Sequence, residues 1–264
     1  MKRYVAILFL LISCSFNGIA QDDYKSNSRL NYYTHEDMAA VAVWIPASKQ
    51  DLSVSVDIVF EFDFLVRRAE VRAGEMNIFE LPLDRFHPGN NELTVSYNEQ
   101  GKWVESDKVQ IKLLDATANE VKIDFVNGKL LTKGSEKGIR TNYNILNLAG
   151  GVGPGHKDFR NYKPRKRMRK LRKEVMAMKD DPALLSWNIS YDPQGQDIDA
   201  EGLAGAYELI KELDPYHPVT ITFISLNDIA KYKPVMDVVQ LGEGLEISEK
   251  EFFLEEPVLH MPIK

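Results

Sequence analysis

The alternation of apolar and polar residues between Leu52 and Phe64 is the sequence feature that most constrains the fold. Apolar residues recur at every second position, and residues such as Ser53, Asp57 and Glu61 separate them. Successive side chains of a strand point to opposite faces, so this period of two predicts a strand with one buried face.

Shorter alternating runs follow at 78–83, 93–97 and 109–113, and turn-forming residues such as the HPGNN segment at 87–91 separate them. No long helical pattern interrupts these runs. Short strands at this spacing are typical of all-β domains. We therefore predict an antiparallel, immunoglobulin-like β-sandwich over residues 32–115.

The pattern changes after residue 115, and Asn127-Gly128 is a strong hairpin signal. The elements expected here are strands at 121–125 and within 130–148, a helix at 164–179, a strand at 184–190, a helix at 200–213, a strand at 219–224, a short helix at 227–233 and a strand at 235–241. Alternating helices and strands with short connections predict a parallel sheet built from βαβ units.

The first 20 residues have the order of features expected of a secretory signal peptide. Lys2 and Arg3 precede the apolar run Val5–Ser13, which is shorter than the roughly 20 residues that a membrane span needs. Cleavage after Ala20 is one prediction. The alternative is a lipobox at 11–14, which would make Cys14 a lipidated first residue.

Both alternatives predict export to the periplasm or the extracellular space, with a cell-surface lipoprotein in the second case. Residues 21–31 are polar and predict a tether. Cys14 is the only cysteine, so a chain cleaved after Ala20 has no disulfide, no cysteine metal ligand and no thiol nucleophile. With 264 residues and 44% hydrophobic composition, the chain can form its core by burial alone.

The segment DPALLSWNISYDP at 181–193 resembles the fourth-strand region of (β/α)₈-barrel glycoside hydrolases, where a segment like "HPALLGWYIADEP" carries the acid/base glutamate. Residues 209–219 resemble the helix-to-strand passage that follows in that family. Val126–Lys129 (VNGK) resembles the start of such barrels after an N-terminal sandwich. This resemblance, to a clan A-like superfamily, implies a (β/α)-barrel domain at 116–264 and action on O-glycosyl bonds of polysaccharide.

The chain departs from this family in two respects. A (β/α)₈ barrel takes about 250 residues, and fewer than 150 follow the predicted sandwich, so we expect a partial or degenerate barrel in which 150–164 replaces two βα units. The acid/base position holds Asp192, whose carboxylate is one methylene shorter than that of glutamate. Glu243 is the partner carboxylate that we select from the late acids, which also include Glu246, Glu255 and Glu256.

Each candidate residue has a structural alternative. Asp192 with Pro193 can form a strand-ending turn, and Glu243 can be a solvated surface acid. Trp187 and Tyr191 can offer flat faces to sugar rings, whereas a tryptophan in a strand can also be buried in the core. His217, between two prolines, is interpreted as a structural residue of the helix-to-strand link.

The run 163–173 is the densest local charge, because eight of its eleven residues are basic in a chain of net charge −6. Export argues against nucleic acid as the partner. Arg165, Arg167, Arg169 and Lys170 are therefore predicted to contact an anionic polysaccharide. The alternative is a solvated helix face without a partner.

No spacing of His, Asp or Glu predicts a metal site, and no motif predicts a cofactor. Two functions remain open. The first is a shortened glycoside hydrolase with Asp192 as acid/base, and the second is a non-catalytic carbohydrate-binding or accessory protein of a glycan-degrading system. A second carboxylate about 5 to 10 Å from Asp192 would distinguish them. The sequence predicts no oligomeric state.

Overall fold

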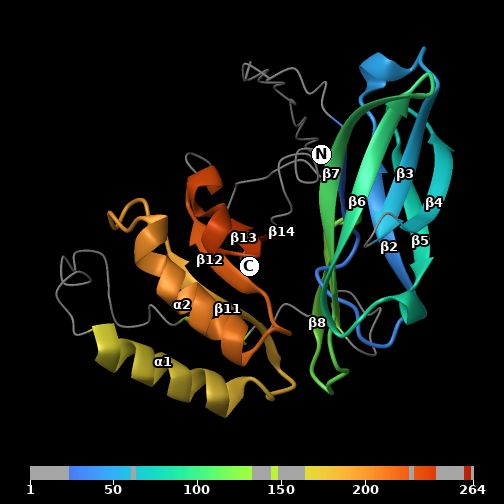
Figure 1. Ribbon diagram of the computed structural model, residues 1–264. Helices are drawn as coiled ribbons and strands as arrows, with labels where there is room; N and C mark the ends of the chain where they lie inside the picture. Colours follow the sequence, from blue (N-terminus) through green and yellow to red (C-terminus); the bar gives the residue numbers. More distant parts are fainter. Residues whose placement is uncertain are drawn as a thin grey trace, which may run out of the picture.

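A computed structural model of the chain describes residues 24–60, 64–132, 144–147, 164–225, 229–241 and 259–262. Strands β1 to β7 form one region and the helices with strands β10 to β14 form the other, with the hairpin β8–β9 at their junction (Figure 1). The predicted signal peptide at 1–20, including Cys14 and Ala20, lies outside the described residues.

The first region contains two antiparallel sheets, with strand orders β1-β2-β5 and β4-β3-β6-β7. The strands are β1 (Lys25–Ser28), β2 (Met38–Trp44), β3 (Val54–Phe60), β4 (Phe64–Val71), β5 (Met76–Pro82), β6 (Gly89–Glu99) and β7 (Lys102–Leu113). Short 3₁₀ helices η1 (Ala47–Lys49) and η2 (Leu83–Arg85) join some of them. One apolar core takes side chains from both sheets, as a β-sandwich does.

The alternation of the sequence produces this core. Val54, Val56 and Ile58 of β3 are at most 2% exposed and belong to the same cluster as Val95 and Tyr97 of β6. The predicted antiparallel β architecture is therefore confirmed.

Two local predictions differ from the structure. The alternation from Leu52 to Phe64 is divided between β3 and β4, which pair with each other, because period two alone carries no information about where a hairpin turns. The predicted tether at 21–31 contains β1, whose Ser28 is buried opposite Val41 of β2. The segment forms a strand because it pairs with β2, and its polar composition alone does not indicate this pairing.

The hairpin of β8 (Val121–Asp124) and β9 (Lys129–Thr132) confirms the predicted Asn127-Gly128 turn. Gly128 has a φ of +59°, a left-handed conformation that glycine adopts without strain. The Asp124 carboxylate accepts the backbone N–H of Asn127 at 3.1 Å and the guanidinium of Arg29 at 2.9 Å. The turn is therefore held by a side chain that is itself tied to the first region.

The second region is a five-stranded parallel sheet in the order β10-β11-β12-β13-β14. Its elements are β10 (Asn144–Asn147), α1 (Pro164–Met178), β11 (Leu184–Tyr191), α2 (Ala200–Leu213), β12 (Val219–Phe223), the 3₁₀ helix η4 (Ile229–Val235), β13 (Val238–Leu241) and β14 (Leu259–Pro262). The predicted βαβ units are thus confirmed. The predicted barrel is not, because the described strands form an open sheet.

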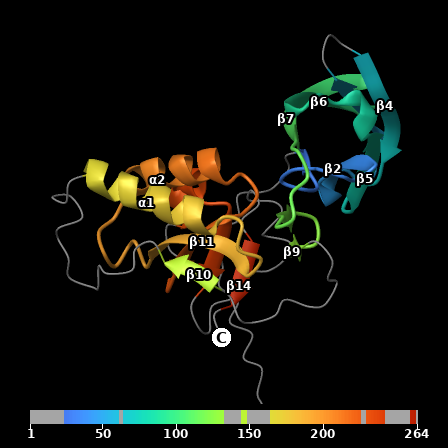
Figure 2. The same cartoon turned by 90° about the horizontal axis from the view of Figure 1, so that it is seen from below.

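Helices α1 and α2 lie side by side on one face of this sheet (Figures 1 and 2). Leu171 and Val175 of α1 pack in one apolar cluster with Leu203 and Ile210 of α2 and Trp187 of β11. None of the helices in the described ranges is long and apolar enough to cross a membrane.

Tyr216, which precedes β12, connects the two regions. Its backbone carbonyl accepts hydrogen bonds from the hydroxyl of Tyr32 at 3.0 Å and from the backbone N–H of Val121 at 3.3 Å. Its own hydroxyl donates to the carbonyl of Asp115 at 2.9 Å. The loop between α2 and β12 therefore fixes the parallel sheet to the sandwich side of the molecule.

Candidate functional site

The face of the parallel sheet that lies opposite the helices is divided into an apolar part and a polar part. Near the amino end of the strands, Val238 of β13 packs with Val121, Ile123 and Leu130 of the β8–β9 hairpin. That end of the face is therefore closed by apolar contacts. The polar part lies further along the strands.

Asn188, Thr222 and Gln240 form a hydrogen-bonded layer across three neighbouring strands. The side-chain amide of Asn188 on β11 donates to the Thr222 hydroxyl at 2.8 Å and to the Gln240 carbonyl oxygen at 3.2 Å. The Thr222 hydroxyl donates to the same Gln240 oxygen at 3.1 Å. All three side chains are buried, and Thr222 and Gln240 are each the penultimate residue of their strands. We call these three residues the polar layer.

Strand β11 carries three buried polar atoms that have no hydrogen-bond partner within the described part of the chain. They are the hydroxyl oxygens of Ser186 and Ser190 and the side-chain carbonyl oxygen of Asn188. A buried polar atom left unpaired costs about 1 to 3 kcal/mol, so such atoms are uncommon and require a physical explanation.

Sequence reasoning missed this layer, although a signal was present. Ser186, Asn188 and Ser190 alternate with Trp187 and Ile189 in a strand that had to be buried on both faces, as strands of parallel sheets are. Such a strand normally reads as a continuous apolar run. Three polar residues in it were therefore the available signal of a buried polar layer.

Asp192 follows the carboxyl end of β11 and forms a tight turn. Its backbone has a φ of +46°, a conformation that aspartate tolerates better than most residues. Its carboxylate accepts the backbone N–H of Gly195 at 3.3 Å, and its own N–H donates to the carbonyl of Thr222 at 2.7 Å. A Cβ at position 195 would lie 2.1 Å from an oxygen of the Asp192 carboxylate, so a larger residue there would displace this side chain from its hydrogen bond.

The two predicted aromatic contacts differ in exposure. Tyr191 is 46% exposed at the end of β11, where its ring is accessible to a ligand. Trp187 is fully buried, and its indole N–H donates to the carboxylate of Asp214 at 2.7 Å. Trp187 therefore belongs to the apolar core under the helices and offers no face to a sugar ring in this structure.

His217 is buried with Asp214, as the structural interpretation of the sequence expects. The Nδ1 atom of His217 lies 2.8 Å from the Asp214 carboxylate, which also accepts the backbone N–H of Tyr216 at 3.2 Å. Burial acts to raise the pKa of the Asp214 carboxyl, but its contacts with His217, Trp187 and Tyr216 outweigh burial, so the pKa is below its ordinary value.

The predicted polyanion contacts lie on α1. Arg169 and Lys170 are exposed, and Arg165 and Arg167 belong to the first turn of the same helix. This helix covers the opposite face of the sheet from the polar layer, so the structure does not bring the basic residues to Asp192. Glu243, the predicted partner carboxylate, lies outside the described residues, as do Glu246, Glu255 and Glu256.

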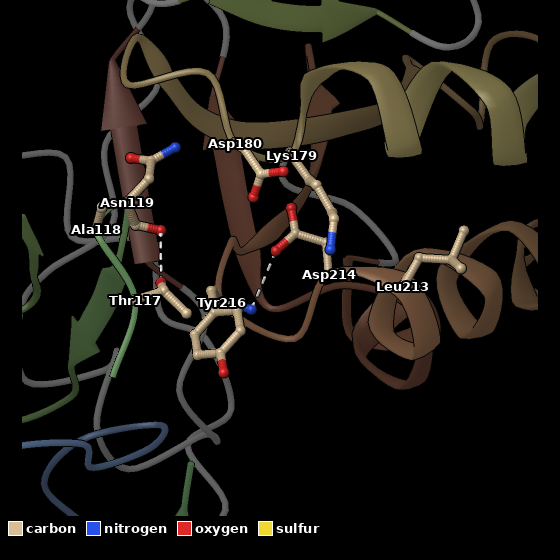
Figure 3. Close-up of a pocket in the computed structure, with 8 residues that line it drawn as sticks. All are labelled: Thr117, Ala118, Asn119, Lys179, Asp180, Leu213, Asp214 and Tyr216. Atoms are coloured by element: carbon tan, nitrogen blue, oxygen red, sulfur yellow. Dashed lines mark hydrogen bonds between the residues drawn. The ribbon is translucent and has the colours of Figure 1, made fainter. Parts of the chain in front are cut away.

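A small pocket of about 110 Å³ lies at the opposite, amino end of the parallel strands (Figure 3). The residues that line it are Thr117, Ala118, Asn119, Lys179, Asp180, Leu213, Asp214 and Tyr216. Pockets for small-molecule ligands usually measure about 300 to 1,000 Å³, so this one is smaller than a usual ligand site. The pocket lies where the linker 114–120 meets the helix ends, and it belongs to the junction between the regions.

Among the residues that the structure describes, no group of three or more His, Cys, Asp or Glu side chains could hold a metal ion. The polar layer contains hydroxyl and amide groups, which recognise neutral polar ligands by hydrogen bonding. Chemically, the arrangement is suited to binding.

No family model matches the sequence, and no curated protein matches it. The solved structures similar to it include glycoside hydrolases. A β-glucuronidase from Parabacteroides merdae is 8% identical with a TM-score of 0.34, and the match covers 90% of this chain and 40% of that one. A glycosyl hydrolase family 2 member from Bacteroides cellulosilyticus DSM 14838 is 11% identical with a TM-score of 0.33, covering 82% and 38%.

A β-glucuronidase from an uncultured Clostridium species is 12% identical with a TM-score of 0.33, and the match covers 83% of this chain and 47% of that one. The chain therefore spans less than half the length of these three structures. With TM-scores this low, the similarity carries no argument about what this chain does.

Proposed function

We propose that this chain is an exported, glycoside hydrolase-like protein that binds carbohydrate at the carboxyl edge of its parallel sheet. The observation that carries the proposal is the polar layer of Asn188, Thr222 and Gln240, together with the hydroxyl of Ser190, which has no partner in the described part of the chain. Sugar hydroxyls both donate and accept hydrogen bonds and so match such groups. Parallel sheets bind ligands at the carboxyl ends of their strands.

A partial barrel is the architecture that we propose for residues 116–264. Strands β10 to β14 follow one another in sequence order, with α1 and α2 on one face. A doubly wound sheet reverses its strand order and covers both faces with helices, whereas a (β/α) barrel keeps sequence order and one helical face. The resemblance of residues 181–193 and 209–219 to barrel glycoside hydrolases supports the same architecture.

The described side chains at this edge of the sheet support binding. The polar layer has no carboxylate among its described members, and the Asp192 carboxylate is engaged by the N–H of Gly195. Hydrolysis requires two carboxyl groups, about 5 to 5.5 Å apart in retaining enzymes and 6.5 to 9.5 Å apart in inverting ones. We therefore place the chain as a carbohydrate-binding or accessory protein of a glycan-degrading system.

The hydrolase alternative rests on the position of Asp192, immediately beyond the strand that carries Asn188 and Ser190. Its test is the Asp192→Asn variant, which keeps the size of the side chain and removes the acid. Loss of a measured glycosidase activity in this variant would support the alternative. Unchanged activity would eliminate Asp192 as the acid/base.

Export rests on the sequence of residues 1–20. We propose cleavage after Ala20 and keep lipidation at Cys14 as the second candidate, because each has its own recognition sequence. Mass analysis of the mature amino terminus checks this. A chain that begins at Gln21 supports cleavage, a diacylglyceryl-modified Cys14 supports a lipoprotein, and an intact Met1 would contradict export.

Ser190→Ala tests the binding site, because it removes a hydroxyl that has no partner within the described residues. Ser106→Ala, on an exposed position of β7, is the matched control. Affinity electrophoresis against a panel of polysaccharides should show binding by the wild type and by the control. We expect about tenfold weaker binding for Ser190→Ala, the effect of losing one hydrogen bond of about 1.4 kcal/mol.

The proposal fails if the wild type binds no polysaccharide in the panel. It also fails if Ser190→Ala and Asn188→Leu both bind as tightly as the wild type, since these two substitutions together remove two of the three unpartnered atoms.

A further inference from the structure

Helix α1 presents its basic residues to solvent while its apolar side is occupied. Leu171 is 8% exposed and Val175 is fully buried in the core beneath the helix. The exposed basic side chains are Arg169, Lys170, Arg172 and Lys173, which we call the α1 basic face.

Two members of the α1 basic face are neutralised locally and two are not. Lys170 pairs with Glu174 at 3.4 Å, and Arg172 pairs with Glu212 of α2 at 3.3 Å. Arg169 and Lys173 make no ion pair with any residue in the described ranges. They are four residues apart, so they lie on one side of the helix, about 6 Å apart along its axis.

This arrangement is unfavourable for the helix itself. Like charges four residues apart repel each other, as Arg169 and Lys173 do. The net charge of the chain is −6, so the surplus of positive charge on α1 is a local property and not a consequence of overall composition. An external anion would remove the repulsion.

We infer that the α1 basic face binds an anionic polysaccharide, with Arg169 and Lys173 receiving its sulfate or carboxylate groups. The guanidinium fork of arginine fits such planar or multi-oxygen anions, and lysine adds a point charge. The inference rests on the proposed carbohydrate context, but it uses a separate surface. The α1 basic face and the polar layer are on opposite faces of the sheet, so their contributions can be removed independently.

A membrane surface is the less suitable anionic partner. An amphipathic helix that lies in a membrane inserts its apolar side into the lipid, whereas the apolar side of α1 is buried against α2 and β11. Met176, 52% exposed, is the only large apolar side chain that the described part of α1 exposes. The helix can therefore offer charge, but no extended apolar surface, to a partner.

The test uses the full mature chain with dextran sulfate and unmodified dextran, which differ only in charge. The variant is the double substitution Arg169→Gln with Lys173→Gln. The matched control is Arg67→Gln with Lys102→Gln, which removes the same charges from exposed positions of the sandwich. Binding is measured by affinity electrophoresis over a series of salt concentrations, with vesicles of anionic phospholipid in a parallel arm.

The wild type should bind dextran sulfate and not dextran, with affinity that falls as salt rises. The α1 double variant should bind about tenfold more weakly, with a shallower salt dependence because fewer counterions are released, while the control should change less than about twofold. The α1 double variant should bind the neutral polysaccharides of the panel as the wild type does, which separates this inference from the polar-layer proposal.

Equal weakening by the α1 variant and the control would show an effect of net charge alone and overturn the inference. So would equal binding of dextran and dextran sulfate. Vesicle binding that depends on Arg169 and Lys173, without dextran sulfate binding, would make a membrane the partner and would also overturn it.

Discussion

The sandwich and the parallel sheet region differ in whether their buried polar side chains have hydrogen-bond partners. In the sandwich, the buried side chain of Asn91 has its carbonyl oxygen bonded to the N–H of His87 and its amide bonded to the carbonyls of His87, Gly89 and Ile111. In the parallel sheet region, side-chain atoms of Ser186, Asn188, Ser190 and His217 are buried without a partner in the described part of the chain.

This difference indicates two roles for buried polar side chains. Where every buried polar atom is paired, the group specifies the fold, because it fixes one local geometry. Where several are left unpaired on one strand, the structure holds capacity for bonds to something else. The sandwich therefore uses its buried polar side chains to fix local geometry, and the parallel sheet region is where the proposed binding site lies.

The largest expected effect is that of Asp214→Ala. The change removes the acceptor of the Trp187 indole N–H and the partner of His217, both buried, so we expect a loss of about 3 to 5 kcal/mol in the free energy of unfolding. Urea unfolding measures it. Asp180→Ala, an exposed acid that also lines the junction pocket, is the control and should change the stability little. A small effect of Asp214→Ala would show that the buried pair of Asp214 and His217 contributes little to stability.

The counterpart in the sandwich is Asn91→Ala, for which we expect a loss of about 2 kcal/mol because it leaves the N–H of His87 and two or more carbonyls unpaired. The unfolding transition should shift while its dependence on urea concentration stays the same. If Asn91→Ala proved neutral, the sandwich would no longer differ from the parallel sheet in how it uses buried polar groups.

Acid should weaken the parallel sheet region through Asp214. Its folded-state pKa lies below the unfolded value, so its contribution is fully present above the unfolded pKa, about 3.9, and is lost as pH falls through the folded pKa. Asp214→Asn has no such titration. Urea midpoints between pH 7 and pH 2 should therefore fall more steeply for the wild type, and parallel curves for the two proteins would contradict this.

The smallest expected effects come from two serines. Ser28→Ala in β1 removes the hydrogen bond from its hydroxyl to the carbonyl of Leu30, 2.7 Å long, and should cost about 1 kcal/mol of stability. Ser190→Ala removes a buried hydroxyl without a partner in the described part of the chain and should leave the stability equal to or above that of the wild type. Thermal and urea unfolding of both variants compare the two regions directly, and a larger loss for Ser190→Ala would reverse the comparison.

Local chemistry made much of the fold predictable. Helix α2 has the predicted bounds Ala200–Leu213, because Asp199 caps its amino end by accepting the N–H of Gly202 at 2.8 Å and Asp214-Pro215 follows its last residue. The hairpin at Asn127-Gly128 was predictable for the same reason. Like the capping signal of α2, its turn signal lies within a few residues of the element that it defines. Strand β1 was not, because its order depends on pairing with β2 more than ten residues away.

The site was predictable only in part. The resemblance to barrel glycoside hydrolases singled out the end of β11 and Asp192. In the structure, both lie at the carboxyl edge of the sheet. The polar layer depends on Thr222 and Gln240, which are distant in sequence from Asn188 and become its neighbours only through the parallel register. Trp187 could not be assigned to one face by alternation alone, because β11 has an irregular register with both of its neighbours.

The turn from Asp192 to Gly195 also limits which residues position 192 can accept. Glutamate tolerates the φ of +46° at position 192 less well than aspartate. Replacing Asp192 by glutamate would therefore strain the turn that connects the end of β11 to the loop before α2, and with it the loop at the carboxyl edge of the sheet.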